Sequence, residues 1–105
     1  MPKSFEIEVT TDADGIVVHL AGELDLAVRT DVGQRLAGVL TGVAADKVVI
    51  DLREVSFCDS SGLGALLDAR QAAADAGVAL VLRDVPPSVD RLLELTDVDG
   101  WLNRE

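Results

Sequence analysis

Two short runs of apolar residues constrain the fold of this chain more than any other feature of its sequence. They are KVVIDL at residues 47–52 and VALVL at residues 78–82. An apolar run of this length is typical of a strand that is covered on both faces, as in a parallel sheet. The residues between the runs carry Leu and Ala at helical spacing, and Gly77 stands where such a helix would end. This strand–helix–strand order predicts a right-handed crossover and a mainly parallel sheet with helices outside it.

A hairpin is expected before this unit. Residues 5–9 alternate apolar and polar side chains, as a half-buried strand does, and residues 11–15 have the composition of a turn. Residues 16–21 are then predicted to form a second strand, antiparallel to the first. From Leu24 to Leu40 the apolar spacing becomes helical, and Gly42 is expected to end that helix.

The second half of the chain completes the predicted fold. Residues 53–59 are expected to form a loop, Pro86-Pro87 to open a short helix, and residues 101–102 to form a short last strand or a packed tail. The predicted fold class is α/β, with a mixed, mainly parallel sheet of about four or five strands, an antiparallel N-terminal edge strand and three or more helices. The length of 105 residues indicates a single domain, residues 1–105.

Charge and composition exclude several function classes. Nineteen acidic residues against nine basic ones give a net charge of −10, which repels nucleic acid and anionic lipid. The N-terminus lacks a signal-peptide core, and the longest uncharged stretch, residues 36–45, falls short of the about 20 residues needed to span a bilayer. We therefore expect a cytoplasmic protein that binds neither nucleic acid nor membrane. One Cys (Cys58) and one His (His19) leave no disulfide and no metal site of the usual kind.

The segment FCDSSGLG, residues 57–64, carries the most chemical information. Asp59, Ser60 or Ser61 could each cap the helix that follows, and glycines allow another part of the chain to approach closely. A helix N-terminus also tolerates a phosphoryl group, because its free N–H groups and partial positive charge favour anions. From the residues alone, both readings of the serines stay open: ordinary caps, or a phosphorylation site. If the strands before residues 25 and 59 are neighbours, Asp25 approaches Ser60.

Four stretches of the chain resemble the STAS-domain family, in particular the bacterial anti-sigma-factor antagonists. They are GELD (22–25), KVVIDLREVSFCDSSGLGALL (47–67), GVALVL (77–82) and PPSVDRLLELTDV (86–98). The resemblance implies a single STAS domain whose unphosphorylated form binds an anti-sigma factor that is also a serine kinase. This binding releases a sigma factor. The kinase then phosphorylates the first serine of the DSSG box, which ends the interaction, and a serine phosphatase restores it.

Carried onto this chain, the resemblance assigns phosphorylation to Ser60. It implies that the partner-binding residues are Asp25, Asp59, Ser60, Ser61, Gly62 and Gly64. The kinase rather than this chain would hold ATP, so the chain is expected to have no cofactor and no catalytic residue, and not to be an enzyme. A monomer or weak dimer is expected. The sequence departs from the family after GELD, where LAVR (26–29) replaces a small polar residue and alanine, a change that bears on partner choice. It also ends soon after Trp101, where relatives often continue.

Other interpretations remain open. A STAS subunit of a transport or signalling assembly, without a switch, would bind its partner equally well after Ser60→Asp. A phospho-aspartate receiver would use Asp51 at the end of a buried strand, but receivers need a late lysine and the only lysines here are Lys3 and Lys47. Cys58 is expected to be a small buried apolar residue, with a redox switch as the alternative. His19 is expected to be a structural or half-exposed strand residue.

Overall fold

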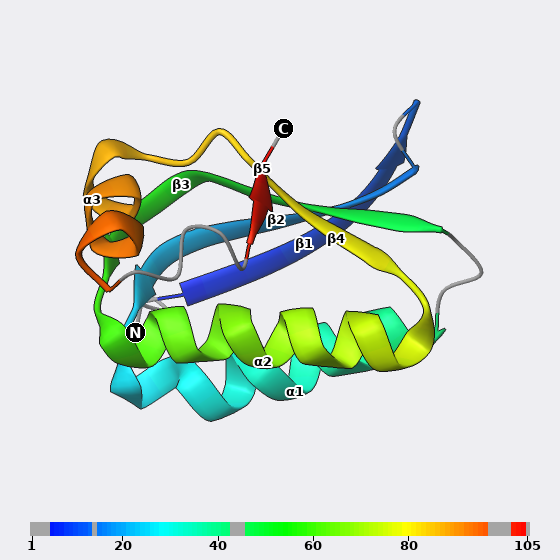
Figure 1. Ribbon diagram of the computed structural model, residues 1–105, viewed down its shortest axis with the longest axis horizontal. Helices are drawn as coiled ribbons and strands as arrows, with labels where there is room; N and C mark the ends of the chain where they lie inside the picture. The colour runs from blue at the N-terminus through cyan, green and yellow to red at the C-terminus, as the bar shows by residue number, and fades with distance from the viewer. Residues whose placement is uncertain (1–4, 14, 43–45, 97–101, 105) are drawn as a thin grey trace.

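The computed structural model describes residues 5–13, 15–42, 46–96 and 102–104, and it is an α/β fold (Figure 1). Its elements, in chain order, are β1 (Phe5–Asp12), β2 (Gly15–Leu24), α1 (Leu26–Gly42), β3 (Lys47–Cys58), α2 (Ser60–Ala76), β4 (Ala79–Arg83), α3 (Pro87–Leu95) and β5 (Asn103–Arg104).

The strands form one sheet in the order β1-β2-β3-β4-β5. β1 pairs with β2 in the antiparallel sense, and each later strand is parallel to its neighbour. The predicted mixed sheet with an antiparallel N-terminal edge is therefore confirmed. Because the parallel strands follow one another in one direction, right-handed crossovers place α1 and α2 on the same face. The two helices lie side by side there, and α3 sits at the end of the sheet where both begin (Figure 1).

The core lies between the sheet and the two long helices. From α1 it takes Val32, Leu36 and Leu40, three of the residues whose spacing predicted that helix. From the sheet it takes aliphatic side chains that point toward α1 and α2: Val18, Leu20 and Leu24 of β2, Val48, Ile50, Leu52 and Val55 of β3, and Leu80 and Leu82 of β4. Within the described part of the chain, no helix is long and apolar enough to cross a membrane.

Two predictions about the middle of the chain are wrong. Residues 53–58 are not a loop but the second half of β3, and Leu24 does not begin a helix but ends β2. The pairing of β2 with β3 explains both errors. The register between the two strands shifts between His19 and Ala21 and again between Gly22 and Glu23. Each shift breaks the alternation of buried and exposed side chains that identifies a strand.

The predictions for the N-terminal hairpin and the C-terminal strand are correct in outline, but the bounds of the strands differ. β1 and β2 extend further into the predicted turn than expected, to Asp12 and from Gly15. Leu102 is buried and β5 follows it, so the last strand lies just beyond the predicted pair. Trp101 lies outside the described residues. Gly77 ends α2 as predicted, in the left-handed conformation (φ 72°), and its N–H bonds the last turn of the helix.

A polar row crosses the face of the sheet away from α1 and α2. The strand registers align Glu8, His19, Asp51 and Arg83 on β1 to β4. His19 Nδ1 and Arg83 Nη2 each lie 3.3 Å from Asp51 Oδ2, and His19 Nε2 is 2.9 Å from the Thr10 hydroxyl. His19 is therefore a half-exposed structural residue, as predicted. Burial raises the pKa of Asp51, but the backbone N–H of Arg53 and the Arg83 guanidinium outweigh it, and the pKa lies below its ordinary value.

We expect Asp51→Asn to lower the free energy of unfolding at pH 7 by about 1 kcal/mol, because charge-assisted hydrogen bonds are lost. A depressed carboxyl pKa stabilises the fold above the unfolded-state value and loses that effect as the pH falls through the folded-state value. The difference between variant and wild type should therefore shrink below about pH 4. Urea unfolding at pH 7 and pH 3 measures it, with exposed Asp75→Asn as control. A difference that is the same at both pH values would contradict the account.

Candidate functional site

The starts of α1 and α2 lie next to each other at the carboxyl ends of β2 and β3. Leu24 pairs with Cys58 at the last position of the two strands, and the Asp59 N–H donates to the Leu24 carbonyl at 3.2 Å. The residues that follow, Asp25 and Asp59, therefore sit at adjacent positions. β2 and β3 are direct neighbours, so the condition under which Asp25 was expected to approach Ser60 is met.

Both aspartates cap a helix. Asp25 Oδ1 accepts the Ala27 N–H at 3.1 Å at the start of α1. Asp59 is the N-cap of α2, and its Oδ1 accepts the N–H groups of Ser61 and Gly62 at 2.9 and 3.0 Å. Of the three capping candidates in the DSSG box, the structure thus selects Asp59.

Ser60 is the first residue of α2, and its side chain is exposed. Ser61, one residue further, is half-buried. Because Asp59 already satisfies the first helical N–H groups, the Ser60 hydroxyl is not needed as a cap. It is free to be chemically modified without the loss of a structural hydrogen bond.

Gly62 has a packing role. It is buried, and a Cβ atom at this position would lie 2.6 Å from Leu24 Cβ and closer still to the Leu24 carbonyl oxygen. Real Cβ atoms do not approach backbone so closely, so only glycine lets the first turn of α2 rest on the end of β2. Gly62 therefore positions the neighbouring Ser60 and Asp59.

Gly64 makes room for a side chain of α1. A Cβ atom here would lie 2.8 Å from Cζ of Arg29, so the guanidinium rests directly over this glycine. Arg29 Nη2 also lies 3.5 Å from Oδ2 of Asp68, one turn further along α2. The sequence analysis missed Arg29. Its only sequence signal is its place in LAVR, the stretch that departs from the family pattern.

Two large apolar side chains close in sequence to the capping aspartates are exposed. Leu26, directly after Asp25, is 72% exposed, and Phe57, directly before Cys58, is 47% exposed. The two side chains add apolar surface to the edge at which Asp25 and Asp59 lie. Leu26 belongs to the LAVR stretch whose departure from the family bears on partner choice, whereas Phe57 was not predicted to have such a role.

Cys58 is half-buried beneath the site, and its Sγ lies 3.5 Å from the Asp59 carbonyl oxygen. Burial, together with the nearby charge of Asp59, raises the pKa of the thiol to about 11. Reactive cysteines have a lowered pKa, because the thiolate is the form that reacts. The environment therefore favours the small apolar residue over the redox switch.

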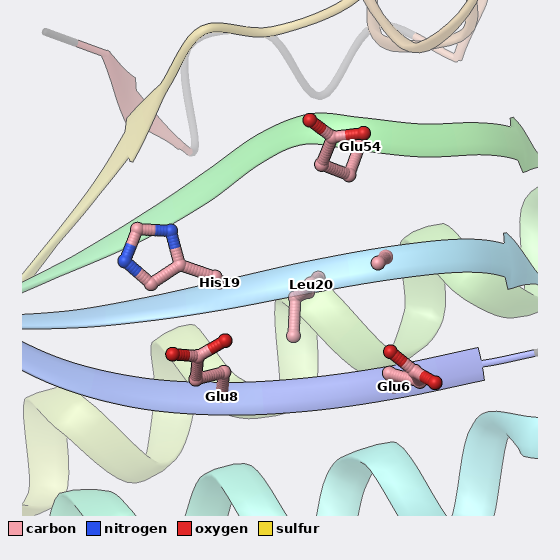
Figure 2. Close-up of a pocket in the computed structure, with 6 residues that line it drawn as sticks. Glu6, Glu8, His19, Leu20 and Glu54 are labelled. Carbon is pink, nitrogen blue, oxygen red and sulfur yellow. The ribbon is translucent and has the colours of Figure 1, made fainter.

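A hollow of about 440 Å³ lies on the opposite face of the sheet (Figure 2). Glu6, Glu8, His19 and Glu54 point into it from β1, β2 and β3, away from α1 and α2. Across residues 5–13, 15–42, 46–96 and 102–104, no three His, Cys, Asp or Glu side chains are grouped so as to hold a metal ion. The hollow shares no lining residue with the Ser60 site.

Asp51 does not fit the receiver alternative. That interpretation required Asp51 at the end of a strand, but β3 continues for seven residues to Cys58. The carboxylate is also buried and bound to Arg83 rather than open to a phosphoryl donor. The structure thus overturns the premise of a phosphorylated Asp51.

These features define an α/β binding domain with two capped helix starts at one edge of its sheet. A family model described as "Mlab, STAS domain" matches residues 7–103. The match covers nearly the whole chain, and the chain belongs to the STAS-domain family.

Individual relatives agree with this assignment. The chain is 29% identical to an anti-sigma F factor antagonist of Paenibacillus polymyxa over 93 residues, which cover 89% of this chain and 80% of that protein. The crystal structure of an anti-sigma factor antagonist from Mycobacterium paratuberculosis has a TM-score of 0.78 at 27% identity, over 99% of this chain and 87% of the other.

The fold is also that of SpoIIAA. Its unphosphorylated form gives a TM-score of 0.74 at 21% identity, over 96% of this chain and 87% of the other. The phosphorylated form of SpoIIAA from Bacillus gives 0.68 at 20% identity, over 96% and 90%. At these identities the likeness shows the shared fold.

The contact between Gly62 and Leu24 can be tested by adding one methyl group. Gly62→Ala should lower the free energy of unfolding by about 2 kcal/mol, because the new Cβ meets backbone that has no room to move. Gly38→Ala is the matched control, since nothing lies within 4 Å of a Cβ there. In the helix interior that change should stabilise by up to about 1 kcal/mol. Equal effects of the two substitutions in urea unfolding would contradict the close approach.

The raised pKa of Cys58 predicts slow alkylation. At pH 8 the native thiol should react with iodoacetamide far more slowly than the same thiol in urea, because less of it is thiolate. The rate in the folded protein should rise toward pH 11 rather than pH 9. Mass spectrometry of timed samples measures both rates, and rapid native alkylation at pH 8 would contradict the account.

Proposed function

We propose that this protein is an anti-sigma factor antagonist whose binding to its partner ends when Ser60 is phosphorylated. The observation that carries the proposal is the position of Ser60: an exposed hydroxyl at the first residue of α2, which makes no cap bond, beside two capping carboxylates. The names of the relatives, and the existence of SpoIIAA in both an unphosphorylated and a phosphorylated form, support it.

The chemistry takes place on the partner. An anti-sigma factor with serine kinase activity binds ATP, and the Ser60 hydroxyl oxygen attacks its γ-phosphorus. The new Oγ–P bond forms as the bond from that phosphorus to the oxygen of ADP breaks, and the hydroxyl proton passes to a base of the kinase. In this proposal the chain contributes a hydroxyl group and a docking surface, as a substrate rather than as an enzyme. A serine phosphatase restores the hydroxyl by hydrolysis: water attacks the phosphorus, the Oγ–P bond breaks, and inorganic phosphate leaves.

The fold is expected to survive phosphorylation because the phosphoryl group replaces no structural bond. Asp59 Oδ1 still accepts the hydrogen bonds from the N–H groups of Ser61 and Gly62. The N-terminus of the helix also favours added negative charge. The surface changes much more than the fold, since about 1.5 to 2 negative charges arrive next to Asp25 and Asp59. A partner with a surface complementary to the unmodified site would then meet repulsion and an uncompensated buried charge.

The remaining predicted site residues divide into two roles in this proposal. Asp25, Asp59 and Ser61 lie at the docking surface, and the exposed Leu26 next to them adds apolar contact. Gly62 and Gly64 act indirectly, because one seats α2 on Leu24 and the other accommodates Arg29. The substitution of Leu26 for a small polar residue is the place where this chain would select its own partner.

The proposal predicts opposite behaviour of two Ser60 variants. Ser60→Asp should fold normally and bind the anti-sigma factor at least about tenfold more weakly, whereas Ser60→Ala should bind normally and resist phosphorylation. Thr11→Asp is the control, since Thr11 is also an exposed hydroxyl residue but lies at the β1–β2 hairpin, at the opposite end of β2 from the start of α2. It should leave the affinity unchanged.

The partner can be captured from cell lysate on immobilised wild-type protein, identified by mass spectrometry and by its binding of ATP, and purified for isotherms. Equal affinity of wild type and Ser60→Asp would contradict the switch and favour a STAS subunit of a transport or signalling assembly. A Ser60→Asp protein that is unfolded in thermal melting would contradict a switch confined to the surface.

A further inference from the structure

Arg29 lies one helical turn from the proposed phosphorylation site. Ser60, Gly64 and Asp68 follow one another at intervals of four residues, so they line one face of α2. Residues at this spacing have Cβ atoms about 5–6 Å apart. The guanidinium of Arg29 rests over the middle position, Gly64, with its two terminal nitrogens 2.9 and 3.1 Å from where a Cβ would stand. It is therefore placed between Asp68 on one side and Ser60 on the other.

The contact of Arg29 with Asp68 is easily exchanged. The nitrogen–oxygen distance is 3.5 Å, and the two side chains are 43% and 65% exposed. Exposed ion pairs of this kind contribute little to stability, because water screens both charges. A hollow of about 380 Å³ beside the pair, between α1 and α2, leaves the long side chain room to move.

A phosphoryl group on Ser60 offers Arg29 a stronger partner than Asp68. It carries about 1.5 to 2 negative charges and three acceptor oxygens, and arginine binds such a group through two parallel hydrogen bonds. Among the described residues, the carboxylates of Asp25, Asp59 and Asp68 also lie at this end, and all three repel the phosphoryl group. Arg29 supplies a cation on this face of α2.

We infer that Arg29 releases Asp68 and binds the phosphoryl group when Ser60 is phosphorylated. The inference rests on the proposed function in taking Ser60 as the acceptor, and it adds the group that receives the phosphate. The new ion pair between Arg29 and the phosphoryl group joins the first turns of α1 and α2. The ion pair between Arg29 and Asp68 is lost. The modification therefore changes the surface of α2 over two turns, from Ser60 to Asp68, rather than at one side chain.

The second pKa of the phosphoserine measures this contact directly. Phosphoserine is incorporated at position 60 during translation, so no kinase is needed, and the ³¹P chemical shift is followed from pH 4 to pH 9. A nearby cation favours the dianion and lowers this pKa. Arg29→Gln should therefore raise the phosphoserine pKa above that of the wild type by about half a unit, a roughly threefold change in proton affinity.

Arg35→Gln is the matched control, because it removes the same charge from an exposed site on the same helix, two turns further on. It should leave the phosphoserine pKa unchanged. Asp68→Asn should lower the value below that of the wild type, since a carboxylate that competes for Arg29 and repels the phosphoryl group is removed. An unchanged pKa in Arg29→Gln, or equal shifts in Arg29→Gln and Arg35→Gln, would overturn the inference.

The outcomes separate this inference from the proposed function. A phosphoserine pKa that depends on Arg29, in a protein whose partner binds Ser60→Asp and wild type equally, would contradict the partner switch alone. If phosphorylation abolishes partner binding but the phosphoserine pKa is the same in wild type and Arg29→Gln, only the ion-pair exchange is contradicted.

Discussion

The close approach of α2 to the end of β2 is the constraint on which the site depends. Gly62 rests on Leu24, and the same Leu24 carbonyl accepts the N–H of Asp59. This junction fixes the first turn of α2 against the sheet and brings its cap next to the start of α1. Any side chain larger than hydrogen at Gly62 would push the turn outward and displace both Asp59 and Ser60.

Two helix starts at one sheet edge give the site its electrostatic character. Each has a partial positive charge from its N–H groups, and each is already neutralised by its own aspartate. Ser60, the first residue of α2, is exposed and supplies no cap hydrogen bond of its own. The basic side chain of Arg29 adds a feature that depends on this chain's own sequence, because it uses the space left by Gly64.

The sequence predicted the elements whose evidence is local, and it missed those that depend on contacts between distant segments. The buried strand at residues 47–52 and the end of α2 at Gly77 were predictable from pattern and turn chemistry. The nearness of Asp25 to Ser60 was predicted only on the condition that their strands are neighbours, which the structure supplies. The second half of β3 was not, because its register shifts against β2 disrupt the alternation. The position of Arg29 could not be foreseen either, since it depends on how α1 lies across α2. The assignment of Ser60 as acceptor came from the resemblance to a family, and it stays a proposal.

The most direct test of the account compares the affinity of the purified anti-sigma factor for two forms of the same chain, with serine or with phosphoserine at position 60. The account predicts that phosphoserine weakens binding at least about tenfold while the circular dichroism spectrum and melting temperature stay close to those of the unmodified chain. Equal affinities would contradict a switch at Ser60. A weaker affinity accompanied by loss of the folded spectrum would contradict a mechanism that acts through surface charge.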